Sequence, residues 1–201
     1  MNWDIVQPNL EKRGFATRRF ATAADARAAL IEEIGENKKI GLGGSMSVVS
    51  LDIEGELKEK GCIFYNHSAC APENIRQELI NAQFADYYLA SSSAVSQDGV
   101  LYNIDGRGNR VTAMLWGSSK LILVIGKNKI VPKGEDGFER IRREACPPNC
   151  RRLNRNTGCA LTGKCTDCAP SAGRICNAFV TIEHPAGRST ELWLVDEDMG
   201  Y

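Results

Sequence analysis

The sequence predicts an α/β protein whose mostly parallel sheet is covered by helices. Up to Leu89, short apolar runs alternate with stretches of helical period, and glycine follows several of these stretches. Alternation of this kind is typical of parallel sheets, which bind ligands beyond the carboxyl ends of their strands. The chain has 201 residues, of which 43% are hydrophobic, and no low-complexity run interrupts it. We therefore expect a single domain over residues 1–201.

The first half of the chain supplies most of this alternation. The predicted strands are 15–20, 38–42, 62–65 and 84–89. The predicted helices are one ending near Arg13, then 23–34, 46–60 and 72–81. Thr22 and Asp25 resemble a capping box at the start of the second helix. Val49, Ile53 and Leu57 recur every four residues, which predicts one continuous helix over 46–60 with a single buried face.

The second half departs from this regular order. Asp98-Gly99 is a hairpin signal before a predicted strand at 100–104. Residues 121–125 form the most hydrophobic run, so we expect a central strand there, followed by a helix over 136–144. The segments 178–182 and 191–195 alternate like strands on either side of a turn, which predicts a hairpin added to the sheet.

The glycine-rich stretch 41–47 is the first candidate site. Ile40 and Leu42 read as the end of a buried strand, and the glycines let the backbone turn and approach a ligand closely. A strand, a glycine turn and a helix N-terminus together favour an anion, because free N–H groups and the helix dipole point the same way. The alternative is a tight turn without a ligand. The candidate ligand-binding residues are Gly43, Gly44, Ser45 and Ser47.

Six polar residues near glycines are further candidates, namely Asp98, Asp105, Arg110, Lys127, Asn128 and Lys129, of which Asp98 is expected to be a turn residue. Arg110 can hold a carboxylate or phosphate through two parallel hydrogen bonds, or it can form a structural pair with a nearby carboxylate. Lys127 or Lys129 would supply a second positive charge. Asp105 would serve as a general base if desolvation raises its pKa, or as a turn residue. Asp105 and Lys127 are thus the catalytic candidates, and Arg110, Asn128 and Lys129 join the ligand-binding set. The expected ligand is a small anionic metabolite, either a carboxylate or a phosphate.

Other polar residues carry weaker signals. His67 and His184 belong to no metal or triad motif, so we expect both to be structural or solvated. Ser91–Ser93 lack the surroundings of a nucleophile elbow and are expected to form hydrogen bonds at a strand end.

The cysteines of the segment 146–176 give the sharpest chemical signal. Cys159, Cys165, Cys168 and Cys176 offer four thiolates in a glycine-containing loop, which suits either zinc or an iron–sulfur cluster. Their spacing is similar to the Cys-x4-Cys-x2-Cys run of plant-type ferredoxins, with one extra residue in the first gap. The alternative is free or disulfide-paired thiols. Cys146 and Cys150 are either a second ligand pair or a redox-labile pair.

Composition excludes several classes of partner. Lys+Arg and Asp+Glu both number 25, so no basic field is available for nucleic acid or for a membrane surface. No run of 18 apolar residues and no signal-peptide pattern is present, so we expect a cytoplasmic protein. Redox partner proteins are expected if the cysteines hold an iron–sulfur cluster. The oligomeric state is not predicted.

Four motifs in order carry a family resemblance. They are Gly43-Gly44-Ser45, the stretch 98–106, Gly108-Asn109-Arg110-Val111 and the stretch 126–131. Together they resemble the LUD domain, the lactate utilization domain found in lactate utilization protein C. The cysteine-rich tail differs from that protein and is closer to a subgroup without an assigned role.

The resemblance implies a fold and a field of activity. The fold would be a three-layer α/β/α sandwich with a Rossmann-like sheet, similar to ribose-5-phosphate isomerase and coenzyme A transferases, here with a C-terminal cysteine-rich loop. The implied function is an accessory or enzymatic component of lactate or other 2-hydroxy-acid oxidation. The resemblance brings no catalytic residue set. Two alternatives stay open: a sugar-phosphate isomerase-like or CoA-transferase-like enzyme with structural cysteines, and a regulator that binds a small anion.

Overall fold

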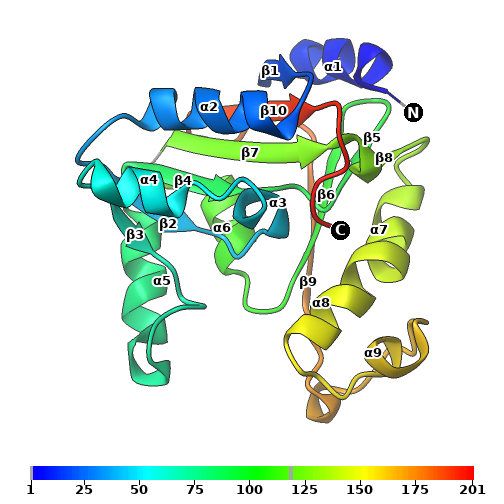
Figure 1. Ribbon diagram of the computed structural model, residues 1–201. Helices are drawn as coiled ribbons and strands as arrows, with labels where there is room; N and C mark the ends of the chain where they lie inside the picture. The colour runs from blue at the N-terminus through cyan, green and yellow to red at the C-terminus, as the bar shows by residue number, and fades with distance from the viewer. Residues whose placement is uncertain (1, 118–119) are drawn as a thin grey trace.

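Two sheets organise the chain in the computed structural model, which describes residues 2–117 and 120–201 (Figure 1). The central sheet has six parallel strands in the order β1-β10-β7-β4-β2-β3, and a four-stranded sheet has the order β8-β5-β6-β9. The central strands are β1 Ala16–Phe20, β2 Lys39–Leu42, β3 Ile63–Tyr65, β4 Tyr87–Ala90, β7 Lys120–Gly126 and β10 Thr190–Val195. The others are β5 Ala94–Ser96, β6 Leu101–Asp105, β8 Ile130–Val131 and β9 Ala178–Ile182.

Helices cover both faces of the central sheet. The first six are α1 Trp3–Lys12, α2 Ala23–Ile34, α3 Met46–Val49, α4 Glu54–Glu59, α5 Ile75–Gln83 and α6 Asn109–Leu115. Apolar residues of α2, α3 and α4 share one core with the sheet, and those of α1, α5 and α6 share a second core with its opposite face. The expected α/β/α sandwich is therefore confirmed.

A further layer packs on the small sheet. It contains α7 Asp136–Arg140, a π-helical turn at Ile141–Ala145, α8 Cys146–Arg152 and α9 Gly158–Thr162. Its apolar and cysteine side chains form a third core with residues of β5, β6 and β8. The cysteine segment thus begins on a helix that is continuous with the predicted helix at 136–144. Short 3-10 turns at Pro72–Asn74, Lys127–Lys129 and Pro170–Ala172 complete the elements.

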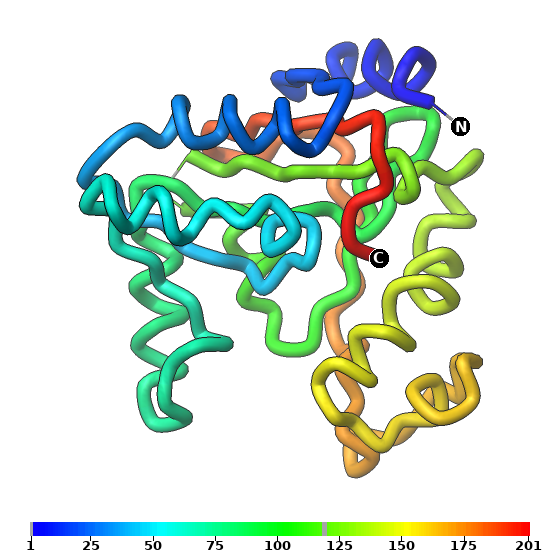
Figure 2. Tube along the Cα trace, in the orientation of Figure 1, coloured from blue at the N-terminus to red at the C-terminus, as the bar shows by residue number. Residues whose placement is uncertain are grey.

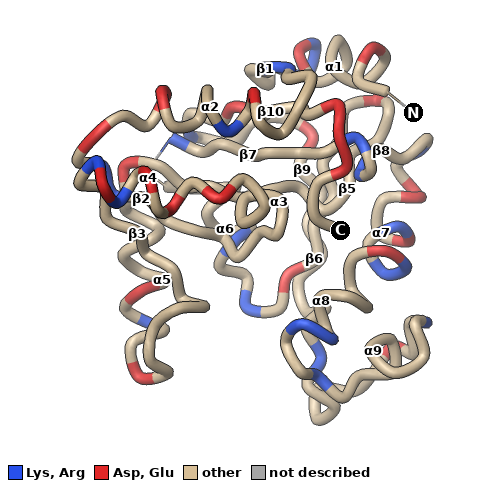
Figure 3. Tube along the Cα trace, in the orientation of Figure 1, with Lys and Arg blue, Asp and Glu red and all other residues tan. Residues whose placement is uncertain are grey.

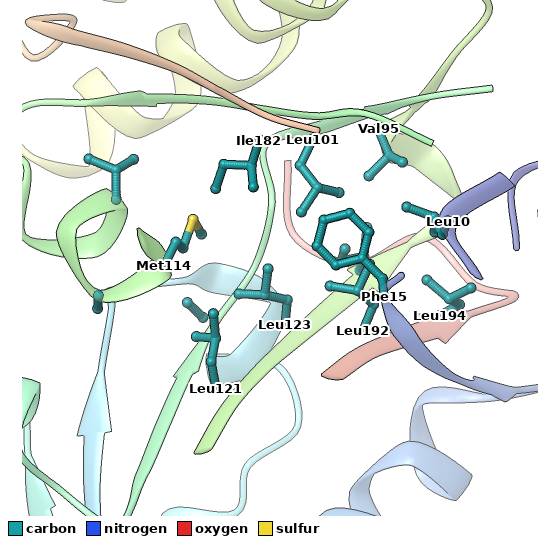
Figure 4. Packing of buried hydrophobic residues seen from close by; sticks show 14 of the residues in the cluster. Leu10, Phe15, Val95, Leu101, Met114, Leu121, Leu123, Ile182, Leu192 and Leu194 are labelled. Atoms are coloured by element: carbon teal, nitrogen blue, oxygen red, sulfur yellow. The ribbon is translucent and has the colours of Figure 1, made fainter. Parts of the chain in front are cut away.

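Strand β7 shows how the sheet divides the cores. Leu121, Leu123 and Ile125 belong to the core on the α1 side, which Figure 4 shows close up, whereas Ile122 and Val124 belong to the α2 side. Successive side chains of a strand point to opposite faces, so a strand buried on both faces must be apolar throughout. The expected central position of 121–125 is confirmed, since β7 lies between β10 and β4.

The single helix expected over 46–60 is wrong. The structure has two short helices, α3 and α4, separated by Asp52, whose φ of 48° is left-handed. Aspartate adopts this conformation more readily than most residues, and the chain changes direction there. Val49 consequently lies on the surface at 55% exposure, while Ile53 and Leu57 are buried.

The hairpin expected from 178–195 is also wrong. Strand β9 pairs antiparallel with β6 in the small sheet, whereas β10 lies parallel between β1 and β7. The reason lies in the two patterns. Residues 192–195 of β10 are apolar and fully buried, as a central parallel strand requires, but β9 has alternating exposure.

Other local predictions are confirmed. Thr22 and Asp25 form the capping box of α2, and the Asp98-Gly99 turn joins the antiparallel strands β5 and β6. After β10 the chain folds back toward α3, as the red trace in Figure 2 shows, and the Ser47 hydroxyl donates a hydrogen bond to the Met199 carbonyl. Within residues 2–117 and 120–201, no helix has the length and apolar character needed to cross a membrane.

Candidate anion-binding site

The site lies where the direction of the connections in the central sheet reverses. From β2 the chain continues to β3 on one side, and from β4 it continues to β7 on the other side. Such a reversal leaves a crevice outside the carboxyl ends of the strands. A cavity of about 690 Å³ opens there and extends to the 3-10 turn after β7 and to α8.

Six of the predicted site residues line this cavity. They are Gly43, Gly44, Ser45, Asp105, Arg110 and Lys129. Ser47 is fully buried and accepts a hydrogen bond from Lys129 at 2.7 Å. Lys127 and Asn128 are not among the lining residues.

The glycine turn approaches its neighbours closely. A side chain at Gly43 would lie 3.1 Å from the Ala90 Cβ and 3.3 Å from the Arg110 Cγ, and Gly44 has a left-handed φ of 75°. The following helix, α3, has only four residues, and its N-cap Ser45 forms no capping hydrogen bond through its side chain. Helix dipoles act through several aligned peptides. This turn therefore gives the cavity its shape but little of its positive field.

The Arg110 guanidinium forms its hydrogen bonds with other groups of the protein. Its Nε and Nη2 contact Asp105 Oδ1 at 3.1 Å, and Nη1 donates to the Ser91 carbonyl at 2.7 Å and to Asn103 Oδ1 at 2.8 Å. Nη2 also donates to the Ile104 carbonyl at 3.1 Å. Hydrogen bonds to Asp105, Ser91, Asn103 and Ile104 use four of the five guanidinium N–H groups, and the ion pair of Nη2 with Asp105 adds a further contact. The structural pair left open by the sequence is therefore the arrangement that the structure shows.

Both carboxylate oxygens of Asp105 also accept hydrogen bonds within the protein. Its second oxygen, Oδ2, accepts hydrogen bonds from the backbone N–H groups of Arg110 and Val111, each at 3.1 Å, at the start of α6. The carboxylate thus joins β6 to α6 and also holds the guanidinium. A general base needs a free lone pair directed at substrate, so these contacts favour a structural role.

Lys127 and Asn128 lie on the far side of the turn after β7. Lys127 is exposed. The Asn128 side chain accepts a hydrogen bond from the Met199 N–H at 3.1 Å and donates one to the Gly200 carbonyl at 3.3 Å. Asn128 thereby holds the C-terminal segment in place. The structure separates both residues from the cavity that their neighbour Lys129 lines.

The cavity has a strong excess of positive charge. Its lining includes Arg107, Arg110, Lys129, Arg152, Arg155 and Arg174, and Asp105 is the single acidic residue among the lining residues that the structure describes. Figure 3 shows basic segments in the loop between β6 and α6 and at the C-terminal end of α8. Arg174 pairs with Asp167 at 2.8 Å. Within the described chain, no ion pair involves Arg107, Arg152 or Arg155.

His67 also lines the cavity, beside the glycine turn. Its ring lies 3.4 Å from the position that a Gly44 side chain would take, and its Nδ1 is buried without a hydrogen-bond partner among the described residues. Burial lowers the pKa of His67, and the charges of Arg107 and Arg152 lower it further. The histidine therefore stays neutral in the cavity wall.

The cysteines gather in two close pairs. Cys146 Sγ lies 3.3 Å from Cys176 Sγ, and Cys150 Sγ lies 3.7 Å from Cys159 Sγ. Cys165 is exposed, and it takes part in neither pair. The hydrogen bond with Cys146 lowers the pKa of Cys176 to about 7, while burial raises the pKa of Cys150 to about 11. Cys146 also lines the cavity, so the thiols and the cavity share a wall.

Sequence reasoning did not find the arginines or His67. Exposed arginines have no local signature, although 151–155 holds three of them within a short stretch after Cys150. The sequence did indicate that Cys146 and Cys150 could face the later cysteines together, because a spacing of four places two side chains on one face of a helix.

Comparison with known proteins supports the architecture. The family model of the LUD domain matches residues 4–195. The crystal structure of a DUF162 family protein from Deinococcus radiodurans matches with a TM-score of 0.52 at 15% identity, over 97% of this chain and 99% of that chain. At this identity the likeness concerns the fold alone. No curated protein matches the sequence.

Proposed function

Since the chain belongs to the LUD domain family, we propose that it binds a small anionic metabolite of the 2-hydroxy-acid or 2-oxo-acid class in the cationic cavity. It would act as an accessory or enzymatic component of 2-hydroxy-acid oxidation. The observation that carries this proposal is the set of arginines 107, 152 and 155 around a cavity in which Asp105, itself paired with Arg110, is the one acidic residue among the described lining residues. Guanidinium groups bind carboxylates and phosphates through paired hydrogen bonds.

The size of the cavity refines the proposal. About 690 Å³ is within the range of pockets that hold drug-sized ligands, whereas a three-carbon acid would fill only a fraction of it. A larger acid, or a small acid beside a second molecule, fits this volume better than lactate alone. Sugar phosphates and coenzyme A thioesters are also large enough to fill this volume, so they are tested as alternative ligands.

Calorimetry with a series of anions tests the proposal. Lactate, pyruvate, ribose 5-phosphate, inorganic phosphate and acetyl-coenzyme A would be titrated into the intact protein. We expect a carboxylate to bind and Arg155→Ala to weaken its affinity about tenfold or more, the usual loss for one charge-assisted contact. Arg151→Ala is the matched control, because Arg151 is exposed on α8 and does not line the cavity.

Each alternative function has its own outcome in this series. Preference for ribose 5-phosphate or for the thioester would replace the proposal with the isomerase-like or transferase-like function. Binding without turnover would favour a regulator. Equal affinities of the parent protein and Arg155→Ala for every anion would reject the cavity as the binding site.

A metal at the cysteines is the second part of the proposal, with a ligand set that differs from the one expected. Around tetrahedral zinc with Zn–S bonds of about 2.3 Å, sulfurs lie about 3.8 Å apart, which is close to the spacing in both thiol pairs. The described residues contain no group of three or more His, Cys, Asp or Glu arranged to hold one ion. Each close pair matches the two cysteines that one iron of a two-iron cluster takes, whereas a single zinc would need all four thiols around one ion. An iron–sulfur cluster here would require a redox partner protein.

A further inference from the structure

Lys129 is a buried amine in the wall of the cavity. It is 3% exposed, and it ends the 3-10 turn that follows β7. The charges that act on its amine are those of Arg140 and Arg110, and both are positive. Burying an ammonium group without a carboxylate is costly, so the environment favours the neutral amine.

The hydrogen bonds around Lys129 support the same protonation state. Its Nζ donates to Ser47 Oγ at 2.7 Å and to Ser91 Oγ at 2.8 Å. The two serine protons are directed elsewhere: Ser47 donates to the Met199 carbonyl at 3.0 Å, and Ser91 donates to the Ser92 carbonyl at 3.1 Å. Both serines therefore accept from the amine and neither donates to it.

The hydrogen bonds of Lys129 leave the lone pair of its Nζ atom without a partner. A neutral amine has two N–H groups and one lone pair, and the two serines take both N–H groups. An ammonium would have a third N–H, for which the described residues provide no recorded acceptor. The arrangement is that of an amine whose lone pair is unused at the edge of a cavity that accepts anions. A lysine desolvated in this way is an activated nucleophile.

We propose that Lys129 is a catalytic nucleophile that forms an imine with the carbonyl carbon of a 2-oxo acid bound in the cavity. The inference rests on the proposed function, because the arginines must hold the carboxylate. Nitrogen adds to the carbonyl carbon, and the C=O double bond becomes a C–OH bond. Loss of water then forms the C=N bond, and both amine protons leave with the carbonyl oxygen. No oxidant or reductant is required.

Ser47 and Ser91 act in this scheme as positioning residues. By accepting both N–H groups they fix the direction of the lone pair, and they come from two other elements: Ser47 lies in α3, and Ser91 directly follows β4. Lys127 belongs to the same short turn but is exposed and does not line the cavity. It is the matched control for every test of Lys129.

Reductive trapping at neutral pH tests the proposal on the unaltered protein. The full chain is incubated with pyruvate and sodium cyanoborohydride, and the modified peptide is mapped by mass spectrometry. We expect one reduced adduct per chain, located at Lys129, and faster trapping there than at any surface lysine. Excess lactate should slow the trapping by competition. Lys127→Ala should be trapped like the parent protein, and Lys129→Met should lose the adduct.

The outcomes separate this inference from the proposed function. If calorimetry shows that pyruvate binds but no adduct forms at Lys129, the nucleophile is rejected and the anion site stands. If no carboxylate binds and only surface lysines are trapped, both are rejected. The mapping uses the parent protein, so the conclusion does not depend on whether a Lys129 variant folds.

Discussion

The Arg110 guanidinium and the Asp105 carboxylate form one structural unit, joined by contacts of 3.1 Å and extended by Arg110 hydrogen bonds to Ser91, Asn103 and Ile104. The side chains of both residues are 11% exposed. This unit joins the ends of β4 and β6 to the start of α6. It holds the cavity wall, and under the proposed function the other arginines of the lining would contact the ligand.

Replacing Arg110 with alanine should therefore reduce stability. Removing one partner leaves Asp105 as an uncompensated buried charge, which costs about 3–5 kcal/mol. Urea unfolding would measure the loss, with Arg151→Ala as the control for removing an arginine. A variant of unchanged stability that had lost only anion affinity would restore the direct ligand-binding role expected from the sequence.

Replacing Lys129 with methionine should increase stability at neutral pH. Burial lowers the pKa of Lys129 in the folded protein, while the unfolded chain keeps a lysine pKa of about 10.4. Below that pH the unfolded state binds more protons, so the lysine opposes folding, and its cost falls as the pH rises. We expect a gain on the order of 1 kcal/mol at pH 7, the usual size for a stabilising substitution, shrinking toward pH 10.

Chemical unfolding at several pH values checks this prediction. Ser47 and Ser91 keep their own hydrogen bonds to backbone carbonyls in the variant, so the substitution leaves no serine proton without an acceptor. A methionine variant that is less stable than the parent at pH 7, by an amount independent of pH, would contradict the neutral buried amine.

His67 should make stability fall as the solution becomes acidic. Its pKa is lowered in the folded protein, and the unfolded chain has a histidine pKa of about 6.5. Below about pH 6.5 the unfolded state takes up a proton that the folded state resists, so stability decreases with falling pH until the lower folded pKa is passed. Measuring the free energy of unfolding of the parent and of His67→Gln at pH 7.5 and pH 5.5 isolates the contribution of His67. His184→Gln, at an exposed position, controls for the loss of a histidine. An equal pH dependence in parent and His67→Gln would exclude the effect.

The cysteine pairs predict which substitution removes a bound metal. Cys150→Ser should abolish it, because Cys150 belongs to a close pair, whereas Cys165→Ser should retain it. Metal analysis and a visible spectrum of anaerobically purified protein give the readout. Retention in the Cys150 variant together with loss in the Cys165 variant would restore the set Cys159, Cys165, Cys168 and Cys176.

The sequence predicted correctly those features that depend on interactions between residues close together in the chain. The capping box at Thr22, the turn at Asp98-Gly99 and the buried run of β7 depend on near neighbours and on strand period. The break at Asp52 and the separation of β9 from β10 depend on packing between distant segments, which a period cannot show.

The same division applies to the site. Gly43 and Gly44 were recognisable because a turn between a strand and a helix needs glycine. The burial of Lys129 was not recognisable, because its hydrogen-bond partners, Ser47 in α3 and Ser91 after β4, are distant in the sequence. Nor does sequence spacing show that four of the five Arg110 N–H groups donate within the protein, since the acceptors are Ser91, which follows β4, and three residues of β6.

Cys146 belongs both to a thiol pair and to the lining of the cavity. If the cavity binds an anion as proposed, anion binding and the chemistry of the thiols share this residue, and any coupling between them is reciprocal. A change at the sulfurs, by oxidation or by loss of a metal, would alter anion affinity, and a bound anion would alter the ease of that change by the same factor. On the proposed function, the state of the thiols would therefore set which of two anion affinities the protein has.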